Sequence, residues 1–126
     1  MNGVARVFFL SSLVFGLAGL LLGNIMAASH DHTQLPTHAH TMVVGWLSFA
    51  VFGMFYHQFP AAAASMLAKI HMAVAELSLL VLIVALYMLY GGKMSFEPAA
   101  AISSIVYALS FLLFAFIAWR AVSAKR

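Results

Sequence analysis

Apolar residues in this chain gather in four long runs, which polar segments separate. The runs cover residues 4–28, 38–59, 70–90 and 98–120. At about 1.5 Å of rise per residue, helices of these lengths reach or exceed the ~30 Å thickness of a membrane's hydrocarbon core. The pattern predicts an all-α membrane protein, a four-transmembrane-helix bundle that forms a single integral membrane domain over residues 1–126.

Composition agrees with a chain that lies in a lipid bilayer. Hydrophobic residues make up 65% of it and charged residues only 7%, which is far from the balance of a soluble domain. The net charge of +3 comes from basic residues scattered at helix ends, so we expect no nucleic-acid partner. The absence of cysteine excludes disulfides, thiolate metal sites and covalent c-type heme attachment. Any heme would be held noncovalently.

The first run has two interpretations. Met26-Ala27-Ala28 loosely resembles a signal-peptide cleavage site. The run is longer than the usual ~7–15-residue core of a signal peptide, so we favour a retained span. Basic residues then set the topology, because Arg6, Lys69 and the tail 120–126 fall on one side of the membrane and Lys93 alone on the other. The positive-inside rule predicts that both termini lie in the cytoplasm of a bacterial inner-membrane protein.

Four histidines stand within eleven residues, and they are the strongest chemical signal in the sequence: His30, His32, His38 and His40. In extended backbone, alternate residues share a side, so His30 and His32 are placed to chelate one metal ion. His38 and His40 begin a helix, where they point ~200° apart and serve separate partners. Imidazole suits copper, zinc and heme iron. The alternative is a solvated loop with incidental histidines.

The helix that begins at the histidine pair has two different faces. One, below His38, is glycine-notched and aromatic, so a flat ring or another backbone can approach it closely. The other, below His40, is aliphatic. The first face holds Gly45, Phe49, Phe52, Gly53 and Tyr56, and the second holds Val44, Leu47, Val51 and Met54.

The segment 38–60 reads His-x-His, Gly-Trp, Phe-Gly-Met-x-Tyr and Pro. This pattern resembles the tenth transmembrane helix of the catalytic subunit of heme-copper oxidases. It is most similar to the cbb-type branch and the nitric oxide reductases, and the NnrS family has similar His-Ala-His segments. The resemblance covers less than a fifth of the chain. Its spacing holds at His38, His40, Gly45, Trp46, Phe52, Gly53, Met54, Tyr56 and Pro60.

The resemblance implies heme b as the cofactor. In those families the first histidine ligates the high-spin heme and the second the low-spin heme, which makes His38 and His40 candidate axial ligands. Gly45 and Trp46 would pack against the ring, and His32 is placed to supply an opposite ligand. The oxidases also need adjacent histidines for copper, and this chain has no His-His pair. Oxygen reduction by this chain alone is therefore not expected.

Two ionisable residues lie near or within the third span. His71 starts this span and should lie near His57, so one heme bridging it to His40 within a single protomer is not expected. It would ligate a second cofactor together with His57 or join an interfacial network. Glu76 is costly to bury, so we expect it to be protonated, paired with Lys69 or facing a cavity. If it has a function, it would carry a proton or contact a heme propionate.

These observations leave three functions open. The first is a heme-b-binding, subunit-I-like membrane protein that transfers electrons or binds nitric oxide or oxygen. The second is a copper-binding accessory or assembly protein of a respiratory oxidase, which would use the histidine cluster. The third is a structural subunit with inert histidines. Because four helices make a thin bundle, we expect a homo-oligomer that shields a heme between protomers, with an oxidase or an electron donor as partner.

Overall fold

The computed structural model describes residues 1–124, and all of the regular structure in that stretch is helical. The all-α class is therefore confirmed. In chain order the elements are α1 (Gly3–Ser29), α2 (Leu35–His40), the π-helix η1 (Thr41–Leu47), α3 (Ser48–Gln58), α4 (Pro60–Ala63), α5 (Met66–Tyr90), the 3₁₀ helix η2 (Met94–Phe96) and α6 (Glu97–Ser123).

Four helical segments are long and apolar enough to cross a membrane, as the sequence predicted: α1, the continuous run α2–η1–α3, α5, and η2 with α6. Large aliphatic side chains project outward from them. Leu17 is 70% exposed, Leu77 66% and Leu112 69%. Exposed apolar area on this scale is costly in water but matches lipid chains. The chain is a multi-pass membrane protein.

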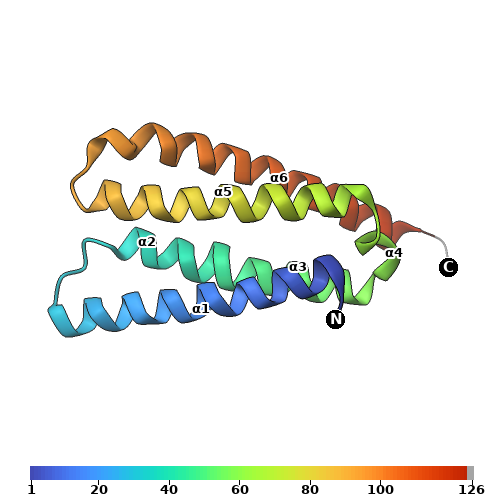
Figure 1. Cartoon of the computed structure of the whole chain (residues 1–126), viewed down its shortest axis with the longest axis horizontal. Helices are drawn as coiled ribbons and strands as arrows, with labels where there is room; N and C mark the ends of the chain where they lie inside the picture. The colour runs from blue at the N-terminus through green and yellow to red at the C-terminus, as the bar shows by residue number, and fades with distance from the viewer. Residues whose placement is uncertain (125–126) are drawn as a thin grey trace.

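The bundle consists of two helical hairpins laid side by side (Figure 1). In the first, α1 packs against η1 and α3, and in the second α5 packs against α6. Short connections join the helices of each hairpin, which is why sequential helices run antiparallel. The N-terminus, α4 and the C-terminal end of α6 lie at one end of the bundle, and the loop that precedes α2 lies at the other (Figure 1).

Aromatic rings fill the core where the two hairpins meet. Phe8 of α1 lies with its ring centroid 5.2 Å from that of Phe52 on α3, and Phe52 lies 4.5 Å from Phe114 of α6. Edge-to-face and tilted pairs of this kind add stability beyond the area they bury. The rings also enclose His71 of α5, which is fully buried.

Three helix ends differ by three or four residues from those expected. The second span starts at Leu35 rather than residue 38, because Pro36 occupies its first turn, where its missing N–H and fixed φ suit a helix start. The third span starts at Met66 rather than residue 70, because the Ser65 hydroxyl accepts a hydrogen bond from the Ala68 amide at 3.1 Å and caps the helix. Helix α6 continues to Ser123, beyond the expected end at residue 120.

Candidate functional site

The histidine pair stands on α2, which a side-chain bridge fixes to the other hairpin. The Gln34 amide donates to the carbonyl oxygen of Tyr87 at the end of α5, over 2.9 Å. Its own carbonyl oxygen accepts from the hydroxyl of Thr37 at 2.7 Å, one turn into α2. Both polar atoms of Gln34 are thus used, and they tie the start of α2 to α5.

His38 turns its imidazole toward α1. Its Nδ1 lies 2.8 Å from the carbonyl oxygen of Gly19, and the ring rests against Gly23. A Cβ atom at Gly23 would come within 2.8 Å of the ring's Cε1 atom, which is closer than real side chains approach. The glycine is therefore required for the ring to lie where it does. The side chain is half-buried.

His40 makes a different contact, within its own helix. Its Nδ1 lies 2.8 Å from the carbonyl oxygen of Pro36, four residues earlier. The side chain is also half-buried. The two histidines thus use separate partners, as their ~200° separation on a helix predicted.

The two contacts have the same chemical consequence. A carbonyl oxygen only accepts hydrogen bonds, so Nδ1 carries the proton in both His38 and His40. In the neutral ring the lone pair then lies on Nε2. An Nδ1–H bound to a backbone carbonyl is the arrangement that fixes the orientation of a metal-ligating histidine and raises its basicity. In both side chains Nε2 is therefore the ring atom that could ligate a metal ion.

A groove of small residues on α1 receives one row of side chains from the second span. Beside each glycine of α1 lies a space that one larger side chain of the second span fills. These larger side chains recur every four residues along the second span. This small-residue packing lets two helices approach closely in a membrane. The pairs are Gly16 with Trp46, Gly19 with Met42, and Gly23 with His38.

A π-helix follows the histidines directly, at Thr41–Leu47. The sequence predicted a continuous α-helix here, and that expectation is wrong for this segment. Hydroxyls fold back onto the main chain around it: Thr41 donates to the Thr37 carbonyl at 2.7 Å, and Ser48 donates to the Val43 carbonyl at 2.9 Å. π-segments inside α-helices occur frequently at functional sites.

The aromatic face below His38 is closed by protein. Phe15 of α1 occupies the space next to Gly45, with its Cβ 2.8 Å from where a side chain at Gly45 would begin. The backbone of α1 lies 3.0 Å from where a side chain at Gly53 would begin. The glycines of this face could have admitted either a flat ring or another helix. The structure shows that helix α1 fills the space, so no room remains for a flat ring.

The aliphatic face below His40 remains open. Val44 is partly buried, and the rest of this stripe is exposed. Trp46, which was expected to pack against a heme, is 43% exposed and covers Gly16. The Nε2 atoms of the two histidines are chemically suited to bind heme iron. A ring the size of heme that is bound here would lie on the outside of the single chain and contact lipid or a second protein surface.

The loop histidines are not arranged as expected. His30 has a left-handed backbone, with φ at 58°, and ends α1, so the extended geometry predicted for His30 and His32 is wrong at His30. Both side chains are exposed. Between them, Asp31 accepts hydrogen bonds from the amide and hydroxyl of Thr33 at 3.0 and 2.8 Å. The backbone hydrogen bond in particular lowers the pKa of Asp31, which stays ionised at neutral pH.

Within residues 1–124 no group of three or more histidine, aspartate or glutamate side chains is gathered closely enough to hold a metal ion. The cluster in the sequence is thus spread out in space. His38 and His40 are oriented by the main chain, whereas the side chains of His30 and His32 are exposed.

His71 lies at the other end of the second span, as expected. Its Nδ1 is 2.9 Å from the Tyr56 hydroxyl, and the aromatic rings of Phe8, Phe52 and Phe114 surround it. Its Nε2 has no hydrogen-bond partner among the described residues. The expected partner, His57, is exposed and faces a surface hollow beside the N-terminus. The sequence therefore identified the right depth for His71 but the wrong neighbour.

Glu76 lies one turn beyond His71 on α5 and is half-buried. The Ser11 hydroxyl of α1 is its polar neighbour, rather than Lys69, whose side chain is exposed. One carboxyl oxygen has no hydrogen-bond partner in the described part of the chain. A carboxyl group inside a membrane span is costly unless it is paired or faces a cavity, and Glu76 has a serine rather than a cation beside it.

Comparison with protein-family models, with curated proteins and with solved structures finds no match to this chain. The resemblance of residues 38–60 to an oxidase helix therefore rests on the motif alone. What the structure adds is independent of that motif, namely the orientation of the two imidazoles and the closed and open faces below them.

Proposed function

We propose that this chain is a heme-b-binding membrane protein, similar in its second span to subunit I of heme-copper oxidases, that transfers electrons or binds nitric oxide or oxygen. The observation that carries the proposal is the pair of Nδ1 contacts, 2.8 Å each, from His38 and His40 to backbone carbonyl oxygens. They leave two Nε2 lone pairs on one short helix.

The chain's own residues perform separate tasks at this site. His40 is the better placed ligand for a ring on the open face, because the stripe below it is apolar and exposed. His38 is wedged between the second span and α1, so it holds its orientation firmly. A bound heme would supply a redox-active iron and, where one axial position is open, a site for a diatomic gas.

A second copy of the chain is the proposed cover for that ring. The aliphatic stripe of Val44, Leu47, Val51 and Met54 turns away from the bundle, with Leu47 51% and Met54 59% exposed. Two such stripes, facing each other, would enclose a flat apolar ring and bring a second set of histidines to it. Lipid alone would leave the ring loosely held.

We place the protein in the bacterial inner membrane with both termini in the cytoplasm. The N-terminus and the C-terminal end of α6 lie at the same end of the bundle (Figure 1), and Arg6, Lys69 and Arg120 stand near that end, whereas Lys93 lies in the turn at the other. The positive-inside rule supports this orientation. The histidines of α2 would then face the outer side, where an electron donor or an oxidase could reach them.

The direct test of the cofactor is the visible spectrum of detergent-purified protein, oxidised and dithionite-reduced, with a pyridine hemochrome assay. We expect a b-type spectrum and about one or two hemes per chain. A colourless protein from cells supplied with ample heme would contradict the proposal.

A copper-binding accessory protein of a respiratory oxidase is the second candidate. The observation that favours it is the exposed loop, in which the ionised Asp31 stands between His30 and His32. Carboxylate and imidazole together suit a transition-metal ion, and exposed ligands suit transfer to a partner. Metal analysis of the purified protein separates the two functions, because this candidate predicts bound copper, a pale preparation, and loss of the metal in His32→Ala rather than in His40→Ala.

A further inference from the structure

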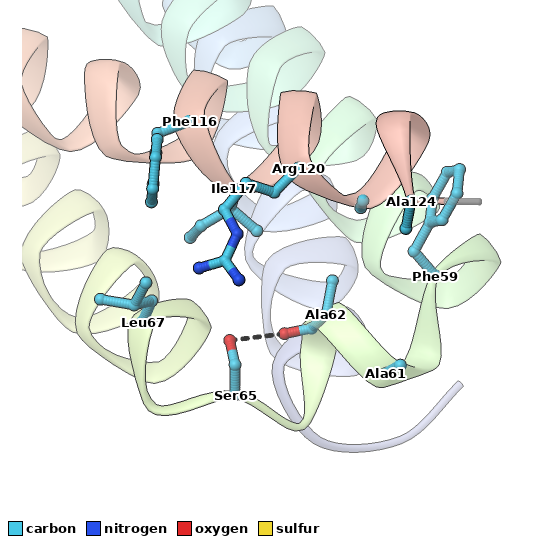
Figure 2. Close-up of a pocket in the computed structure, with 10 residues that line it drawn as sticks. Phe59, Ala61, Ala62, Ser65, Leu67, Phe116, Ile117, Arg120 and Ala124 are labelled. Carbon is cyan, nitrogen blue, oxygen red and sulfur yellow. Dashed lines mark hydrogen bonds between the residues drawn. The ribbon is translucent and has the colours of Figure 1, made fainter.

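A hollow of about 310 Å³ lies at the end of the bundle that carries the N-terminus and the C-terminal end of α6, far from the histidine pair. It opens between the turn after α4 and the last turns of α6 (Figure 2). Arg120 of α6 directs its guanidinium into this space, toward Ser65 and Leu67 (Figure 2). The hollow thus combines one cation with walls that are mostly apolar.

No acidic side chain is available to pair with Arg120. The chain has three acidic residues, and two of them, Asp31 and Glu97, lie at the opposite end of the bundle. The third, Glu76, is about three turns into α5 and has Ser11 beside it. The guanidinium instead lies 5.7 Å from the centroid of the Phe116 ring. That contact leaves the edge of the guanidinium, with its N–H donors, free for an anion.

The other polar group of the hollow is already used. The Ser65 hydroxyl donates to the Ala62 carbonyl oxygen at 2.7 Å (Figure 2) and accepts from the Ala68 amide at 3.1 Å. Among the described side chains that line the hollow, Arg120 is therefore the group with unused hydrogen-bonding capacity. A planar guanidinium with several free donors matches the oxygens of a phosphate group in two-point contacts.

The remaining walls fit a hydrocarbon chain. Phe59, Leu67 and Ile117 line the hollow with apolar surface. Helix α6 has 27 residues and spans about 40 Å, which exceeds the ~30 Å hydrocarbon core, so its last turn reaches the level of the lipid headgroups. A phospholipid carries a phosphate group joined to acyl chains. Its phosphate would contact the Arg120 guanidinium, and one acyl chain would lie along the apolar walls of the hollow.

We propose that this hollow is a binding site for one anionic phospholipid, whose phosphate Arg120 contacts and whose acyl chain lies against Phe59, Leu67 and Ile117. Basic pockets between transmembrane helices recognise acidic headgroups in this way. The site is separate from the proposed heme site, because it lies at the other end of the bundle and shares no residue with it.

Native mass spectrometry of the purified protein with phosphatidylglycerol or phosphatidylcholine tests the site. We expect wild-type protein to retain one phosphatidylglycerol preferentially. Arg120→Gln should weaken that binding about five- to tenfold, since a phosphate contact of this kind contributes on the order of one power of ten. Lys69→Gln is the matched control, because it removes the same charge at the same end but Lys69 does not line the hollow.

Three results would overturn the proposal: equal losses in the two variants, equal retention of both lipids by wild-type protein, and displacement of the lipid by millimolar inorganic phosphate, which would indicate a site for the free anion. Arg120→Lys is a control for the possibility that Arg120→Gln loses the lipid only because it misfolds. It keeps the charge but loses the two-point geometry, so it should fall between wild type and Arg120→Gln.

Discussion

The Nδ1 atom of His38 lies 2.8 Å from the carbonyl oxygen of Gly19, which belongs to a different helix. The contact fixes the tautomer of the imidazole and joins the histidine helix to α1. It exists because Gly23, one turn further along α1, leaves space for the ring. The orientation of a candidate ligand thus depends on a small residue in another part of the chain.

Gly23→Ala should displace this ring. The added Cβ would stand 2.8 Å from Cε1 of His38, so the ring must move and lose its bond to Gly19. We expect a fall of about 1–3 kcal/mol in stability, as for other overpacked sites, together with a weakened or shifted heme spectrum. Thermal unfolding and visible absorption in detergent measure the two effects.

Gly16→Ala is the matched control for that variant. It stands in the same groove, and its Cβ would meet Trp46 at 2.9 Å instead of a histidine. A similar loss of stability with a smaller change in the spectrum is expected, because Trp46 is not a candidate ligand. If both alanines change the spectrum alike, His38 has no special part in holding the cofactor.

Gln34→Glu should loosen the start of α2. The substitution keeps an oxygen for Thr37 but replaces the amide donor that binds the Tyr87 carbonyl with a second oxygen, which repels it. Loss of one such bond corresponds to about 1 kcal/mol. Faster amide hydrogen exchange over residues 34–40, with unchanged exchange in α6, would show the effect. Exchange that is unaltered near α2 would mean that the bridge does not hold this helix.

Tyr56→Phe should destabilise the aromatic core at the other end. It removes the hydroxyl 2.9 Å from His71 and leaves both ring nitrogens of a fully buried histidine without partners. We expect a loss of about 1–2 kcal/mol, measured by thermal unfolding. Tyr87→Phe, at a residue that is 53% exposed, should change stability little. Equal effects of the two variants would show that the buried hydrogen bond contributes nothing.

The hydrophobic pattern was sufficient to predict the four spans, because a run of twenty apolar residues in a membrane protein has few structures available to it. The turn per residue also divided the second span into two faces, of which the structure buries the one with Phe49 and Tyr56 and exposes the one with Val51 and Met54. Helix ends were predicted less well. Ser65 and Pro36 each moved a boundary by three or four residues through local capping that the apolar pattern does not record.

Contacts between distant segments were beyond the sequence. Nothing in the spacing of residues relates His38 to Gly19, or His71 to Tyr56, because these pairs form only when the spans pack side by side. The same holds for the glycines of α1 and the side chains that fill the space beside them, such as Gly23 and His38. The π-helix after His40 has no sequence signal that we could identify.

The central claim is that His38 and His40 ligate heme, and the reduced-minus-oxidised visible spectrum of three variants tests it most directly. His57→Ala serves as the control, because His57 is exposed and lies at the other end of the second span. We predict a b-type spectrum in wild type and in His57→Ala, and its loss in His38→Ala, His40→Ala or both, with helix content unchanged by circular dichroism. A b-type spectrum that survives in both His38→Ala and His40→Ala would contradict the account.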